Sequence, residues 1–90
     1  MNLEEKKITA VEVVQFVSQK YGLTGLEMVH YKNAENFPTS FENLDIHLVS
    51  RSELSDTMAV ELINEPRCLL IYENKSLNVF IVVIKKKETT

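Results

Sequence analysis

The segment that most constrains this chain is its last long apolar stretch, in which residues 79–84 are apolar without interruption. A strand that exposes one face to water alternates polar and apolar residues, so a strand that is apolar on nearly both faces is expected to be covered on both. The stretch lies in a predicted hairpin, Cys68–Lys87, with arms at Cys68–Tyr72 and Leu77–Lys85 and a turn at Glu73–Ser76. We therefore place this hairpin at the centre of the fold.

Chain length and charge limit the class of protein. Ninety residues are enough for one domain, and we expect residues 1–90 to form a single globular domain with flexible ends at 1–7 and 86–90. The apolar share of 44% and the charged share of 26% are typical of a soluble globular protein. The formal charge of −3 argues against a nucleic-acid partner, because nucleic-acid binders usually carry a basic face.

The cysteine content and the first residues indicate a compartment. Cys68 is the only cysteine, so no internal disulfide can form, and small secreted domains often depend on such bridges. Residues 1–7 are not followed by an apolar signal core, and residues 79–84 are too few to span a membrane. We therefore expect a cytoplasmic protein with no membrane partner.

The clearest local signal predicts a helix over Thr9–Tyr21. Thr9 and Glu12 have the spacing of a capping box, in which each side chain accepts a hydrogen bond from a free backbone N–H group of the first turn. Gly22 follows as the residue that commonly closes a helix in the left-handed conformation. The predicted buried stripe repeats at helical spacing and comprises Ala10, Val13, Val14, Val17 and Tyr21.

Two further strands are predicted, over residues 26–32 and 44–51. In the first strand, alternation places Leu26, Met28 and His30 on one face. In the second, the expected inward residues are Leu44, Ile46 and Leu48, and the expected outward residues are Asp45, His47 and Arg51. Residues 33–43 read as a loop that Phe37 and Phe41 anchor to the core.

Residues 54–64 are compatible with two structures. As a helix, the segment would be capped by Ser52 or Ser55 and ended by Pro66, with an apolar stripe of Leu54, Met58, Ala59, Leu62 and Ile63. As a strand, Met58, Val60 and Leu62 would alternate with polar or small residues. The predicted fold class is α+β, with the N-terminal helix packed on a small, mainly antiparallel sheet of four to five strands ending in the C-terminal hairpin. Residues 54–64 supply either a second helix or an extra strand.

No pattern of residues indicates catalysis, a cofactor or a metal. Gly22 and Gly25 are the only glycines and do not form a phosphate-binding loop. His30, His47 and Cys68 are scattered singly along predicted strands, whereas a zinc site needs three or four converging ligands. Cys68 stands among apolar residues that are expected to bury it as an unreactive thiol. We therefore predict no catalytic, cofactor-binding or metal-binding residues.

Lys85, Lys86 and Lys87 end the apolar strand and allow two interpretations. Lysines at a strand end discourage edge-to-edge aggregation, which explains why the charges begin where the apolar run stops. A short lysine cluster can also contact phosphate. We favour the first interpretation because Glu88 adjoins the cluster and no aromatic residue is interleaved with it.

These observations predict a small noncatalytic interaction protein, a regulator, adaptor or inhibitor that acts through protein contacts, alone or as a homodimer. Val79, Ile81 and Val83 would pack under the N-terminal helix, and Phe80, Val82 and Ile84 form the candidate interface on the other face. The alternative is a small-molecule-binding or enzymatic domain. Its pocket would lie near Tyr31, His30, His47 and Tyr72.

Overall fold

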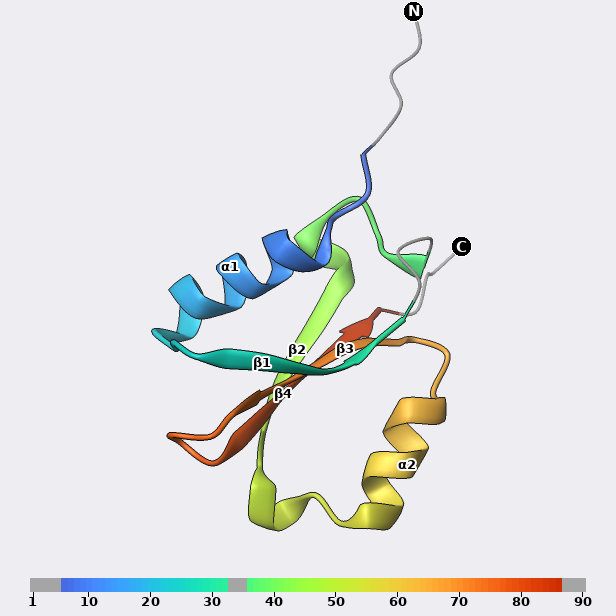
Figure 1. The fold of residues 1–90 in the computed structure, drawn as a ribbon. Helices are drawn as coiled ribbons and strands as arrows, with labels where there is room; N and C mark the ends of the chain where they lie inside the picture. Colours follow the sequence, from blue (N-terminus) through green and yellow to red (C-terminus); the bar gives the residue numbers. More distant parts are fainter. Residues whose placement is uncertain (1–5, 33–35, 87–90) are drawn as a thin grey trace, which may run out of the picture.

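The structure is a computed structural model, and it describes residues 6–32 and 36–86. Figure 1 shows a sheet with helices on either side of it. The longer elements are α1 (Ala10–Tyr21), β1 (Leu26–Tyr31), β2 (Leu44–Ser50), α2 (Asp56–Asn64), β3 (Cys68–Asn74) and β4 (Val79–Lys85). Two single 3-10 turns, η2 (Phe41–Asn43) and η3 (Arg51–Glu53), flank β2. The four strands are antiparallel in the order β1-β3-β4-β2, which confirms the predicted α+β class.

The apolar strand β4 is covered on both faces, as its sequence predicts. Figure 1 shows α1 and α2 on opposite sides of the sheet. On the α1 side, Ile81 and Val83 are fully buried beneath Val13 and Val17. The smaller cluster on the α2 side has three buried residues, Cys68, Ile71 and Val82. The α1 side therefore holds the main core, and the α2 side is the thinner layer.

Local signals determine α1 as predicted. The Thr9 hydroxyl accepts a hydrogen bond from the N–H of Glu12 at 3.2 Å, and the Glu12 carboxylate accepts one from the N–H of Thr9 at 3.0 Å. Gly22 closes the helix at φ +64°, a left-handed conformation that favours glycine. The loop after β1 is also anchored as expected, because Phe37 is buried and Phe41 stacks on Phe16 with ring centroids 4.6 Å apart.

The segment that allowed two readings is a helix. Ser55 caps α2 by accepting a hydrogen bond from the N–H of Met58 at 3.2 Å, and the helix ends at Asn64, two residues before Pro66. The sheet therefore has four strands.

The hairpin turn lies two residues later than the sequence predicts, at residues 75–78 rather than Glu73–Ser76. The side chain of Asn74 accounts for the shift, because its Oδ1 accepts a hydrogen bond from Leu77 and its Nδ2 donates one to the carbonyl of Thr24, both at 2.8 Å. Asn78 then takes φ +60°, a conformation that asparagine tolerates better than most residues.

The predicted alternation in β1 is wrong beyond Met28. Met28 pairs with Tyr72, but His30 pairs with Ile71, so Val29 is an extra residue in a β-bulge. The bulge moves His30 to the α2 side of the sheet while Met28 stays on the α1 side. Alternation in β2 holds better, since Leu44 is buried and Ile46 packs on the α1-side core, although Leu48 is 44% exposed.

The lysines that end the apolar strand follow a central strand, and their role against edge-to-edge aggregation stays a prediction. β4 pairs with β3 on one side and β2 on the other, so Lys85 and Lys86 do not lie at an edge of the sheet. The backbone N–H of Lys85 bonds to the carbonyl of Arg67. Lys87 falls outside the described residues, and so do residues 1–5 and 87–90 of the ends at 1–7 and 86–90 that are expected to be flexible. The two edges of the sheet are β1 and β2.

Candidate functional site

Helix α2 covers the sheet incompletely. None of its residues is buried, and Met58 is 46% and Val60 56% exposed. Leu62 packs on the small cluster formed by Cys68, Ile71 and Val82. The C-terminal end of the helix is tied to β1 by Lys32, whose Nζ donates to the carbonyl of Ile63 at 3.2 Å. The helix is therefore held near its C-terminal end, and its first turn stands away from the sheet.

A groove of about 440 Å³ lies between α2 and the sheet, and we refer to it as the α2 groove. Its walls are apolar on both sides, with contributions from Val49, Val82, Ile84, Leu54, Met58 and Leu62. Its rim is polar and comprises His47, Glu61, Glu65 and Arg67. Apolar walls with a polar rim are the usual composition of a binding site, and the volume falls within the range of ligand pockets.

The rim has a surplus of negative charge. Glu65 pairs with Arg67, with 3.6 Å between Oε1 and Nε. Glu61 has no ion pair among the residues that the structure describes. Glu53 and Asp56, which do not line the groove but lie just before and at the start of α2, have none there either. Arg51 is engaged by Glu73 and so does not offset these carboxylates. The α2 groove is thus apolar inside and acidic at its helical edge.

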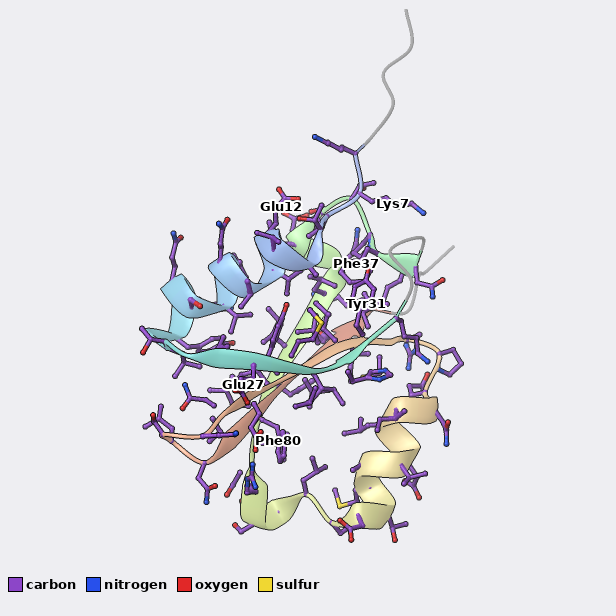
Figure 2. All side chains as sticks on the ribbon, viewed as in Figure 1. Lys7, Glu12, Glu27, Tyr31, Phe37 and Phe80 are labelled. Carbon is purple, nitrogen blue, oxygen red and sulfur yellow. The ribbon has the colours of Figure 1, made fainter. Side chains whose placement is uncertain are left out.

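Two of the three residues of the candidate interface belong to this groove. Val82 and Ile84 line it, although Val82 itself is buried and Ile84 is partly buried. Phe80 does not line it, because the guanidinium of Arg51 lies over its ring, 5.4 Å from the centroid. Figure 2 shows Phe80 on the opposite side of the sheet from Tyr31 and Phe37.

The four polar residues of the alternative pocket do not gather at one place. Tyr72 lies beneath α1, where its hydroxyl donates to the carbonyl of Ala10 at 3.1 Å, and burial raises the pKa of Tyr72 to about 12. Tyr31 packs against Phe37 on the same side. His30 and His47 share the α2 side but lie on opposite edge strands, three strand spacings or roughly 14 Å apart.

His30 and His47 differ in their surroundings. The Nε2 atom of His30 is buried and has no hydrogen-bond partner among the described residues. Burial, and to a lesser extent the positive charge of Lys32, lowers the pKa of His30. His47 is exposed and belongs to the rim of the α2 groove.

Cys68 is a buried structural thiol. Its burial raises its pKa, an effect that the nearby Lys32 opposes and Glu65 reinforces. A thiol in this state is a poor nucleophile. Within residues 6–32 and 36–86, no three histidine, cysteine or acidic side chains are placed to hold a metal ion.

The sequence indicated the apolar residues of the groove but not the groove itself. Leu54, Met58 and Leu62 are spaced four residues apart, which identifies the face that α2 turns toward the sheet. The same spacing is found in a helix that packs tightly. Whether the helix closes on the sheet depends on the lengths of its connections, for which the sequence carries no local signal.

Comparison with family models, with curated proteins and with solved structures gives no match. Across the described part of the chain, no helix is long and apolar enough to cross a membrane.

Proposed function

We propose that this protein is a small noncatalytic interaction protein, a regulator, adaptor or inhibitor, that holds a segment of a protein partner in the α2 groove. The observation that carries the proposal is a helix without a single buried residue above an apolar groove. An apolar groove with an exposed side chain such as Met58 is typical of an interaction site, because burying that apolar surface against a partner is favourable.

The chemistry of the groove indicates the chemistry of the partner. Apolar walls favour a partner segment that inserts one or two aliphatic or aromatic side chains. The carboxylate of Glu61 on the rim, which has no ion pair among the described residues, favours a lysine or arginine next to those side chains. The partner is therefore a protein with an apolar segment flanked by basic residues.

A reducing interior such as the cytoplasm is the compartment that suits this protein. Its single cysteine is free and buried, and the domain is stabilised by apolar packing on both faces of the sheet. A small domain built in this way does not need the disulfides that secreted domains of similar size often use.

Two substitutions on the same helix test the proposal. Met58→Glu places a charge in the α2 groove, whereas Val60→Glu places the same charge on the outer surface of α2, outside the groove. Both positions are exposed, so both variants should keep the fold, and thermal unfolding checks this. Each variant and the wild type are used to capture partners from native cell extract.

We expect to capture a partner that binds the wild type and Val60→Glu equally well. Its affinity for Met58→Glu should be at least about tenfold weaker, as is usual when a side chain at the centre of an interface is replaced. Equal retention by Met58→Glu would contradict the proposal. A small molecule that copurifies with the wild type and is lost from Met58→Glu would instead support the small-molecule-binding alternative, and native mass spectrometry would detect it.

A further inference from the structure

Strand β2 lies at one edge of the sheet. The N–H of Lys86 bonds to the carbonyl of Asn43, and the N–H of Arg51 bonds to the carbonyl of Asn78. Between these two pairs the register with β4 is unbroken, so every second residue from Asn43 to Arg51 bonds to β4. The residues in between point their N–H and C=O groups away from the sheet, and they are Leu44, Ile46, Leu48 and Ser50.

Strand β4 is the only described strand that pairs with β2. At the start of the outer edge the N–H of Leu44 bonds to the carbonyl of Phe41, and the outward-pointing backbone groups of Ile46 and Leu48 have no backbone partner among the described residues. Natural sheets usually protect such an edge with a lysine, a proline or a bulge. β1 is protected by its bulge at Val29, but the seven residues of β2 contain no bulge, lysine or proline.

We propose that β2 pairs with β2 of a second copy of this chain, antiparallel and about a two-fold axis at Ile46. Backbone groups that point away from β4 can bond only to backbone groups of the second copy that also point away from its β4. The position of the two-fold axis must therefore place these residues opposite one another. An axis at Ile46 pairs this residue with Ile46 of the partner subunit and Leu44 with Leu48 of the partner subunit. The four-stranded sheets of the two copies then form one continuous sheet.

The side chains on the α2 side select this register. Asp45 faces His47 of the partner subunit in a non-hydrogen-bonded pair, the type in which side chains are closest. The imidazole N–H can donate to the Asp45 carboxylate, whose Oδ1 lies 3.9 Å from Lys86 and whose Oδ2 is left for the histidine. The two-fold axis forms this contact twice.

The side chains on the α1 side of β2 also favour the register with the axis at Ile46. Leu48, which is 44% exposed in one copy, meets Leu44 of the partner subunit and extends the apolar core across the axis. An axis at His47 would place two histidines opposite each other. An axis at Leu48 would place Asp45 opposite Arg51 of the partner subunit, which Glu73 already engages within its own copy.

Sedimentation tests the dimer over a range from about 1 µM to about 500 µM, because a strand-edge dimer forms by mass action. We expect the wild type to pass from monomer to dimer in this range. Leu48→Lys introduces the charge that protects natural edges and should leave the protein monomeric throughout. The matched control is Val11→Lys, which makes the same kind of change at an exposed position on α1 and should still dimerise. A wild type that stays monomeric at the highest concentration, or Leu48→Lys dimerising like the wild type, would overturn the proposal.

Cysteine crosslinking tests the register. Ile46→Cys places two thiols across the axis with Cα atoms about 5.5 Å apart, within reach of a disulfide. His47→Cys and Leu48→Cys place them beyond the roughly 7 Å limit. The native Cys68 is buried, so the wild type is the uncrosslinked control. A disulfide-linked dimer of Ile46→Cys alone supports the axis at Ile46, and crosslinking through position 47 or 48 instead overturns it.

Met58→Glu should leave the dimer unchanged, which separates this proposal from that of the α2 groove.

Discussion

Tyr72 links the central sheet to the start of α1. Its ring is buried on the α1 side of β3, and its hydroxyl donates to the carbonyl of Ala10, 62 residues away in the sequence. We expect Tyr72→Phe to lower the free energy of unfolding by about 1 kcal/mol, because the carbonyl loses a buried hydrogen bond while the ring packing is kept. Urea denaturation measures the change. Tyr31→Phe is the control at a ring that is exposed, and a loss as large as that of Tyr72→Phe would contradict the assignment.

Tyr72 also makes the stability of the protein depend on pH, and this stability should fall at alkaline pH. Burial raises the pKa of Tyr72 to about 12, above the value of about 10 for an exposed tyrosine. The folded state therefore holds the phenolic proton more tightly than the unfolded state, and this stabilisation is present below pH 10 and lost as the pH rises toward 12. The stability difference between wild type and Tyr72→Phe should shrink over this window.

His30 makes the stability of the protein depend on pH in the acidic range. Burial and Lys32 lower its pKa below the ordinary value of 6.5, so the folded state binds its proton less tightly than the unfolded state. Stability should fall as the pH drops below 6.5, and His30→Gln should reduce this fall. His47→Gln removes the exposed histidine as the matched control. Equal pH profiles for wild type and His30→Gln would show that His30 is not the source.

At the scale of elements, the sequence predicted the features that depend on contacts within a single segment. The Thr9–Glu12 capping box and Gly22 determine both ends of α1 by contacts within the helix, so the sequence could predict them. The turn of the hairpin depends on Asn74 bonding to Thr24, a residue 50 positions away. The bulge at Val29 likewise depends on the pairing of β1 with β3. Such distant contacts leave no periodic pattern in the segments that form them.

Helix α2 should be less protected from hydrogen exchange than helix α1 in the isolated protein. It contains no buried residue, whereas α1 buries Val13 and Val17 completely. Local opening costs less free energy where few apolar contacts are lost. We expect the amides of α2 to exchange with solvent faster than those of α1 in hydrogen-exchange mass spectrometry. Equal protection of the two helices would contradict the incomplete packing of α2.

At the scale of the whole molecule, the two sides of the sheet differ in their packing. The α1 side holds the main core, and the α2 side holds a groove that the described residues leave unfilled. The sequence predicted that the outer face of β4 needs a covering layer, and two of the three residues that it proposed as an interface, Val82 and Ile84, line the α2 groove. It could not show that Arg51 covers Phe80, because that contact requires the end of β2 to lie beside the start of β4.

The use of the α2 groove for a protein partner is tested most directly by hydrogen exchange in the presence of a partner captured with the wild-type protein. Binding in the groove should slow exchange in α2 and in the segments of β2 and β4 around Val49 and Val82, since these residues line it. Exchange in α1 should stay the same. Unchanged exchange in α2, with new protection only elsewhere, would contradict the groove as the binding site.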